Sequence, residues 1–441
     1  MSELGGPEPP TPEGRGAVGP HGGSGRPPLL SLDEALARLA AGAASSRIAE
    51  VETVSTFDAL GRVLARDLVS PIDVPPADNS SMDGYALRTA DVPAPGAVLP
   101  VTQRIAAGHA GEPLEPGSAA RIFTGAPLPA GADAVVMQEL CEALGDGHVR
   151  VDEVPRQGQW IRRRGEDVTR GRAVLARGAR LTPQAMGLAA TVGAATLEVV
   201  RRPRVALMST GDELVMPGAV APEALAPGAI YNSNRFTLRG LLLAAGCEVT
   251  DLGIVPDRLA ATREALRRAA AGHDLILSSG GVSVGEEDHV KPAVQAEGHL
   301  DLWQLAIKPG KPLAFGAVRR SSGGAPGEAL FVGLPGNPVS SFVTFLLAVA
   351  PVLRVLLWQE PTMPPAIEMR ADFDWPRPDK RREFLRVRRN EAGGLDLYPN
   401  QSSGVLTSAV WAHGLVDNAP SQAIRRGDTV GFLPMDALIG R

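Results

Sequence analysis

The chain has 441 residues, of which 44% are hydrophobic and 21% are charged, which is typical of a globular protein with two to four domains. Its net charge of -5 argues against a general nucleic-acid-binding protein, because there is no basic excess to neutralise phosphates. Cys141 and Cys247 lie far apart and outside any metal-binding spacing. We therefore expect a reduced, cytoplasmic protein without disulfides or structural zinc.

The first 28 residues predict a disordered tail. They contain eight glycines and seven prolines, with no apolar core and no signal-peptide pattern. An amphipathic helix is expected from Leu32, because Ser31 suits the N-cap and Glu34 stands where a capping box needs it. Residues 29–69, together with residues 164–200, predict a linking domain whose own helix begins at Pro183 after a Thr182 cap.

Residues 70–163 predict an inserted all-β domain. This stretch is rich in proline, glycine and valine, and it contains short alternating runs at 134–137 and 148–151. Two charged clusters stand out within it or at its border. The polar cluster 78–88 favours a functional role, because a turn needs only one Asx-Gly step. The cluster 162–167 favours an interdomain salt-bridge cluster over an anion clamp, because neighbouring opposite charges usually neutralise each other.

Residues 201–354 alternate strand-like and helix-like segments. Strands are expected at 205–208, 248–255 and 275–278, and helices at 233–245 and 259–271. This order is typical of a parallel sheet wound with helices, which binds ligands at the carboxyl ends of its strands. The apolar stretch Phe342–Trp358 contains Pro351 and Arg354, so we expect a buried helix and no membrane contact.

Residues 355–441 return to short strands, at 384–387 and 429–433 for example, and predict a small C-terminal β domain. The predicted fold class is therefore a multidomain α/β protein. It combines a central three-layer βαβ domain with an inserted all-β domain, a linking α/β segment and the small C-terminal β domain.

Three glycine-punctuated loops of the α/β domain point to an anionic, phosphate-bearing ligand. They read Ser-Ser-Gly-Gly-Val-Ser-Val-Gly (278–285), Lys-Pro-Gly-Lys-Pro (308–312) and Gly-Leu-Pro-Gly-Asn-Pro (333–338). Backbone amides and helix N-termini suit phosphates, and lysines add point charges. Carboxylates beside such loops, such as Asp288 and Glu213, suit a divalent cation.

Simpler interpretations of these residues stay open at this point. Asp288 could complement a helix dipole, and Glu213 could belong to a structural turn. Lys308 and Lys311 could flank a solvated turn, and helix capping alone could explain Asn337 before Pro338.

Taken together, the motifs resemble those of the molybdopterin molybdenumtransferases, the family that includes the E domain of gephyrin and its plant counterpart. The resemblance covers about residues 29–441 and rests on seven motifs in the family's order. The motifs occupy residues 78–86, 123–129, 162–167, 209–214, 280–285, 308–312 and 333–340.

The resemblance implies an enzyme that takes adenylylated molybdopterin and molybdate, releases AMP with the help of Mg²⁺, and places molybdenum on the pterin dithiolene. The implied catalytic residues are Asp83, Glu213, Asp257, Asp288, Lys308 and Lys311. Three of these, Glu213, Asp257 and Asp288, would surround the Mg²⁺. Arg258 follows Asp257 where the family commonly has Asp or Asn, so the functional position is Asp257 or its neighbour.

The expected substrate-binding residues come from several parts of the chain: Thr124, Gly280, Gly281, Ser283, Gly336, Asn337, Arg386 and Ser403. Among these, Arg386 and Ser403 match family positions near the anion site. Asp83 and Thr124 match functional positions in the inserted β domain, which in the family faces the α/β domain of a second subunit. The resemblance thus implies an elongated homodimer with a shared site.

Two other functions are weighed against this one. The chain could be a scaffold that keeps the fold for partner binding, or it could catalyse the preceding adenylyl transfer. The extra β domains argue against the second alternative, because a stand-alone adenylyltransferase is a single domain. A separate adenylyltransferase is also a possible partner that docks on this chain.

Overall fold

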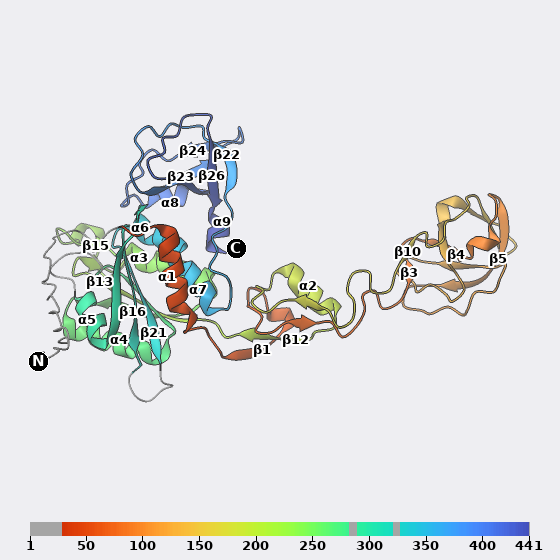
Figure 1. Ribbon diagram of the computed structural model, residues 1–441, viewed down its shortest axis with the longest axis horizontal. Helices are drawn as coiled ribbons and strands as arrows, with labels where there is room; N and C mark the ends of the chain where they lie inside the picture. The colour runs from red at the N-terminus through yellow and green to blue at the C-terminus, as the bar shows by residue number, and fades with distance from the viewer. Residues whose placement is uncertain (1–28, 282–288, 321–326, 441) are drawn as a thin grey trace, which may run out of the picture.

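The computed structural model describes residues 29–281, 289–320 and 327–440. The tail 1–28 and two of the predicted site residues, Ser283 and Asp288, lie outside these ranges. The chain is elongated (Figure 1): the α/β domain and the C-terminal β domain lie at one end, and the inserted β domain lies at the other. A narrow linking region connects them.

The first helix, α1 (Leu32–Ala44), begins with the predicted capping box. The Ser31 hydroxyl accepts from the Glu34 amide at 3.2 Å, and the Glu34 carboxylate accepts from the Ser31 amide at 3.0 Å. Its buried face, which includes Leu39, packs against the last helix of the α/β domain. Although α1 precedes the linking region in sequence, it therefore belongs to the α/β core.

The linking region consists of two antiparallel strand pairs and one helix. Strand β1 (Val51–Ser55) pairs with β12 (Thr196–Val200), and β2 (Leu68–Val69) pairs with β11 (Ala173–Leu175). Helix α2 (Pro183–Thr191) begins as predicted, because the Thr182 hydroxyl accepts from the Ala185 amide at 3.2 Å. A short 3-10 turn, η1 (Thr56–Asp58), completes this region.

The inserted domain is built on a six-stranded sheet with the order β7-β4-β6-β5-β9-β8. Its strands are β4 (Gly84–Leu87), β5 (Ala97–Ile105), β6 (Ala119–Ile122), β7 (Ala134–Met137), β8 (Cys141–Ala143) and β9 (His148–Val151). A further pair, β3 (Asn79–Ser80) with β10 (Ile161–Arg162), lies where the insert joins the linking region. The 3-10 turns η2 (Thr89–Asp91) and η3 (Gln138–Leu140) connect strands. This is the expected all-β fold.

The α/β domain contains a six-stranded sheet with the order β16-β13-β17-β21-β20-β18. The strands are β13 (Arg204–Thr210), β16 (Glu248–Val255), β17 (Leu275–Ser279), β18 (Gly298–Gln304), β20 (Pro312–Arg319) and β21 (Glu328–Leu334). The predicted strands β13, β16 and β17 are parallel, as expected, and the sheet is mixed because β20, which the sequence analysis did not predict, runs antiparallel to both of its neighbours. The connections on either side of β20 are too short for the crossover helix that parallel strands need.

The direction of β20 affects the edge of the sheet at which the parallel strands end, which we call the ligand edge. Since β20 is antiparallel to β21, its first residue, Pro312, lies at the edge where β13, β17 and β21 end. The Lys308–Lys311 loop precedes β20 and so reaches the same edge as the glycine-rich loops. The described residues of the three loops therefore gather at one edge as expected, and the lysine loop reaches it because β20 is antiparallel.

Helices cover both faces of this sheet and make the expected three layers. Helices α4 (Leu259–Gly272) and α5 (Val290–Glu297) pack on one face, where the core includes Ala206 and Phe331. Helices α1, α3 (Ser233–Ala244), α6 (Pro338–Thr344) and α7 (Ala350–Leu356) share the other core. A π-helical turn, Phe345–Val349, joins α6 to α7. The small pair β14 (Leu214–Val215) with β15 (Ile230–Tyr231) and the turn η4 (Pro222–Ala224) lie between β13 and α3 in sequence.

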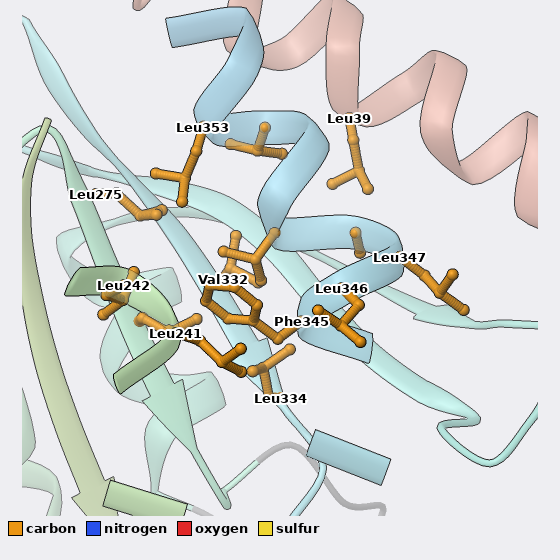
Figure 2. Packing of buried hydrophobic residues seen from close by; sticks show 14 of the residues in the cluster. Leu39, Leu241, Leu242, Leu275, Val332, Leu334, Phe345, Leu346, Leu347 and Leu353 are labelled. Carbon is orange, nitrogen blue, oxygen red and sulfur yellow. The ribbon is translucent and has the colours of Figure 1, made fainter. Parts of the chain in front are cut away.

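The apolar segment Pro338–Leu356 is long and apolar enough to cross a membrane, but 94% of its most apolar window is buried. Figure 2 shows Phe345 and Leu353 of this segment between Leu39 of α1 and the sheet residues Leu275 and Val332. The prediction of a buried core helix is confirmed.

The C-terminal domain has a sheet with the order β19-β23-β25-β26-β22, and β24 pairs with β23. Its elements are β19 (Ile307–Lys308), β22 (Ile367–Arg370), β23 (Arg382–Arg389), β24 (Leu395–Leu397), β25 (Gly414–Asn418), β26 (Thr429–Pro434), α8 (Thr407–Trp411) and α9 (Met435–Ile439). Strand β19 comes from the segment between β18 and β20 of the α/β domain. The lysine loop is therefore held by both domains.

Candidate functional site

A cavity of about 710 Å³ lies at the ligand edge of the α/β sheet, between this sheet and the C-terminal domain. Its lining includes nine of the predicted site residues: Glu213, Asp257, Gly280, Gly281, Lys308, Lys311, Gly336, Asn337 and Ser403. Residues that the sequence reasoning missed also line it: Thr210, Ser340, Arg381, Gln401 and Ser402 among them. The cavity therefore gathers residues from segments about 190 positions apart in the chain.

The glycine-rich loop after β17 is shaped by close backbone approach. Gly280 has φ 86°, and a Cβ atom there would lie 2.8 Å from the carbonyl oxygen of Thr210. Only glycine fits both the left-handed backbone and this contact. The end of β17 can thus lie directly against the end of β13, and its backbone lines the cavity.

Two carboxylates line the cavity from the ends of neighbouring strands. Glu213 follows β13, and Asp257 follows β16. Asp257 Oδ1 lies 3.4 Å from His289 Nδ1, at the start of α5. The neighbouring Arg258 stands at the N-cap of α4, and its side chain makes no capping hydrogen bond. Within the described ranges, no group of three or more potential metal ligands is found.

On the opposite side, Lys308 is held by two carboxylates. Its Nζ lies 3.2 Å from Glu383 Oε1 and 3.5 Å from Asp379 Oδ2. Glu383 is fully buried, and its other oxygen accepts from Trp375 Nε1 at 2.7 Å and from the Asp379 amide at 3.1 Å. These contacts fix Lys308, so its interpretation as part of a merely solvated turn is wrong.

Arg381 is a cationic group that the sequence analysis did not single out. Its Nη2 lies 2.9 Å from Asp379 Oδ2, and its Nε donates to Asp379 Oδ1 at 3.0 Å. Hydrogen bonds from Arg381, opposed by some burial, hold the pKa of the Asp379 carboxyl well below its usual range. The local run Asp379-Lys380-Arg381-Arg382 was the signal, but nothing in it indicates which cation faces the cavity.

Lys311 differs from Lys308 and Arg381. It is partly buried in the cavity wall, yet within the described part of the chain it makes no ion pair with a carboxylate. An unneutralised ammonium group in a concave site is a receptor for an anion, because ligand binding supplies the missing counter-charge.

The start of α6 contributes Gly336 and Asn337 to the cavity. Asn337 occupies the N-cap position, but its side chain makes no capping hydrogen bond. Capping alone therefore does not explain Asn337, and its side-chain amide can bind a ligand in the cavity. The Val339 amide of the first turn donates instead to the Ser403 carbonyl at 2.9 Å, which ties the C-terminal domain to this helix.

Arg386 does not line the cavity but lies behind it. Burial lowers the pKa of its guanidinium to about 10, and its Nη1 and Nε donate to the Phe384 carbonyl and the Ser408 hydroxyl. Its backbone amide and carbonyl both bond the Gln401 side chain, at 2.9 and 3.0 Å. Arg386 thus supports the segment that presents Gln401, Ser402 and Ser403.

Asp83 and Thr124 are brought together in the inserted domain, far from the cavity of the same chain (Figure 1). Asp83 Oδ1 accepts from the Thr124 amide at 2.8 Å and from its hydroxyl at 2.7 Å. These two hydrogen bonds lower the pKa of the Asp83 carboxyl, so the group is ionised at neutral pH.

The basic cluster near the insert forms the predicted salt bridges. Arg163 Nη1 lies 2.7 Å from Asp78 Oδ2, and Arg164 Nε lies 2.6 Å from Asp73 Oδ2. The interpretation as a salt-bridge cluster is confirmed for these two arginines. They join the segment that leaves the inserted domain to the segment that enters it.

Comparison with known proteins agrees with this fold and site. Three family models match: the MoeA N-terminal region, domains I and II, over residues 30–193; a probable molybdopterin binding domain over residues 206–355; and the MoeA C-terminal region, domain IV, over residues 368–435. The chain is therefore a MoeA-type α/β multidomain protein.

Its relatives are similar over most of their length. The molybdopterin molybdenumtransferase of Haemophilus influenzae is 39% identical over 89% of this chain and 95% of its own. Molybdopterin molybdenumtransferase 2 of Mycobacterium tuberculosis is 37% identical over 83% and 90%. The crystal structure of the molybdopterin biosynthesis MoeA protein from Pyrococcus horikoshii is 29% identical, with a TM-score of 0.76 over 92% of this chain and 99% of that one. The chain belongs to the molybdopterin molybdenumtransferase family, which works in molybdenum cofactor biosynthesis.

Proposed function

We propose that this chain inserts molybdate into adenylylated molybdopterin, with Mg²⁺-dependent release of AMP. One observation carries the proposal: carboxylates and cations line the same cavity. Glu213 and Asp257 come from the strand ends, and Lys308, Lys311 and Arg381 come from the lysine loop and the C-terminal domain. Breaking a phosphoanhydride beside an oxyanion requires both kinds of charge in fixed positions.

The acidic residues fit Mg²⁺. This ion is commonly held by one or two carboxylates together with substrate phosphates, so Glu213 and Asp257 suffice as protein ligands. Asp288, which lies outside the described residues, is proposed as a third member of this set. When bound, Mg²⁺ would neutralise the charge of the substrate's pyrophosphate.

The basic residues suit the oxyanions. Among the residues that the structure describes, Lys311 has no ion-pair partner, and Lys308 is held in place by buried Glu383. The backbone of Gly280 and Gly281 would receive the nucleotide end, with Ser283 of the same loop, while Gly336, Asn337 and Ser403 would bind the remaining polar groups. Arg386 would act indirectly, through the Gln401 segment.

Asp83 and Thr124 would act from a second copy of the chain. The pair is exposed on the inserted domain, away from its own cavity, so a homodimer in which this domain faces the partner's cavity would complete the site. We further propose that the enzyme works in the cytoplasm and that a separate adenylyltransferase supplies its substrate by docking.

The test is AMP release from adenylylated molybdopterin with Mg²⁺, with and without molybdate. We expect molybdate-dependent AMP release by the wild type and by Asp301→Asn, a carboxylate change on β18 outside the cavity, but not by Asp257→Asn. Absence of AMP release by the folded dimer would contradict the proposal and favour a scaffold. Formation of adenylylated molybdopterin from ATP would instead indicate the adenylyltransferase activity.

A further inference from the structure

A second cavity, of about 560 Å³, lies away from the proposed site, where three parts of the chain meet. Its walls come from residues 176–180 of the linking region, from the end of α7 and the segment after it, and from Gly440 near the C-terminus. It shares no lining residue with the cavity of the proposed site.

Three arginines line this second cavity. They are Arg177, Arg180 and Arg354. Arg354 Nη1 donates to the carbonyl oxygen of Thr362, and Arg177 lies over the ring of Trp358 at 3.7 Å from its centroid. Within the described ranges, none of the three guanidinium groups forms an ion pair, although the backbone amide of Arg177 donates to Asp67 Oδ1 at 2.7 Å. The acidic residue that shares the lining, Glu360, is exposed.

The positive charges in this cavity are poorly compensated. Burial, and to a smaller extent the nearby charge of Arg180, lowers the pKa of Arg354. Burial, followed by the charge of Arg202, lowers the pKa of Arg180. Partly buried like charges repel each other, and an anion between them would offset this cost.

The walls that carry these arginines are held in place. Gln359 Nε2 donates to the Gly178 carbonyl at 3.0 Å, which joins the two arginine-bearing segments directly. Trp358 adopts φ 63°, and its Nε1 donates to the Ile48 carbonyl at 2.8 Å. A site that is already assembled loses little conformational entropy when a ligand binds.

We propose that this cavity binds a tetrahedral oxyanion with two or more negative charges, such as phosphate, sulfate or molybdate, through Arg180 and Arg354 with Arg177 at its rim. The planar guanidinium group presents paired N–H donors that match the oxygen edges of such an anion. The site does not depend on the proposed enzymatic activity, because its residues are separate from those of the first cavity.

The test is isothermal titration calorimetry of the full chain, first with inorganic phosphate and then with molybdate. Three variants separate the two cavities. Lys311→Gln weakens anion binding in the first cavity, Arg180→Gln does so in the second, and Arg47→Gln is the matched control. Arg47 packs over the same Trp358 ring, 5.0 Å from its centroid, but does not line the cavity.

Phosphate binding at the second cavity is compared in the Lys311→Gln background, where the first cavity binds anions weakly. We expect this binding to be unchanged by Arg47→Gln and to be at least about tenfold weaker with Arg180→Gln, the loss typical of a hydrogen bond to a charged group. Molybdate should behave like phosphate at this site, and in addition should bind the first cavity in all chains with Lys311. Unchanged phosphate binding by Arg180→Gln would overturn the proposal. Absence of phosphate binding by the wild type, with loss of the dimer in Arg180→Gln, would overturn it too and assign the arginines to a subunit contact.

Discussion

The cavity at the α/β sheet and the Asp83–Thr124 surface of the inserted domain both carry family motifs, but their polar groups are arranged differently. At the α/β edge, the motifs meet in a concave site where Lys311 has no ion-pair partner among the described residues. On the inserted domain, Asp83 and Thr124 bond each other on an exposed surface. The first region can hold a ligand within one chain. In the second region the two side chains bond each other, and we propose that they act on a ligand only when this surface faces a partner's cavity.

The difference also separates two kinds of order. The cavity wall is fixed by buried groups, as Glu383 fixes Lys308. The side chain of Asp83 is held at an exposed surface by two hydrogen bonds from Thr124. Changes to the buried groups that hold the first region, such as Glu383, should therefore lower stability, whereas changes in the second region should alter activity without loss of stability.

The largest effect is expected for Lys311→Gln. Removing an unpaired cation from the cavity should lower AMP release by about 100-fold or more, as loss of one electrostatic group commonly does. The melting temperature should not fall, because the charge has no partner in the described part of the protein. Lys380→Gln, an exposed lysine outside the cavity, is the matched control and should retain wild-type rates.

A smaller effect is expected for Glu383→Gln. The buried carboxylate accepts hydrogen bonds from Trp375 and Asp379 and pairs with Lys308, so the substitution should cost about 2 kcal/mol of unfolding free energy. Urea unfolding measures this cost. The same change at exposed Glu368 on β22 should stay within about 0.5 kcal/mol. Equal losses in the two variants would show that Glu383 has no special role.

For Asp83→Asn we expect a loss of about tenfold in AMP release, the size of one hydrogen bond to a charged group. The urea midpoint should match the wild type, because Asp83 is held only at the surface of the insert. A large drop in the urea midpoint would make Asp83 a structural residue and weaken the contrast between the two regions.

The smallest effect concerns the titration of Asp83. Its pKa is lowered from 3.8, so the contact with Thr124 is present at neutral pH and is lost only as the pH falls through the lowered pKa. Thr124→Val removes the hydroxyl donor but keeps the amide donor. The pKa should therefore rise toward 3.8 without reaching it, while Thr124→Ser should leave it unchanged. NMR of ¹³C-labelled aspartate follows this titration, with Asp83→Asn as the assignment control.

Much of this structure could be predicted from local signals. The capping box at Ser31 and the Thr182 cap specify their helices within a few residues, and the alternation after Arg204 indicates the α/β domain. The antiparallel strand β20 was not predicted, because the sequence of a strand does not by itself encode its direction. The short connections on either side of β20 were the signal that could have indicated its direction.

The site residues that directly follow a strand could be predicted from the sequence, whereas those from other parts of the chain could not. Glu213, Asp257 and Gly280 follow strands, so the rule for parallel sheets places them together. Arg381 and Ser402 come from another domain, and only the tertiary fold brings them to the cavity. Conversely, Arg386 was expected to bind substrate from the family resemblance, outside the seven motifs, yet it is buried and does not line the cavity.

The central claim is that one subunit's inserted domain completes the partner's cavity. It is tested most directly by mixing Asp83→Asn and Lys311→Gln chains, unfolding and refolding them together, and measuring AMP release. Random mixing should give heterodimers in which one of the two sites has both residues intact, so activity should recover to roughly a quarter of the wild type. If the mixture is only as active as the average of the two separate variants, Asp83 does not act across the dimer and the claim is wrong.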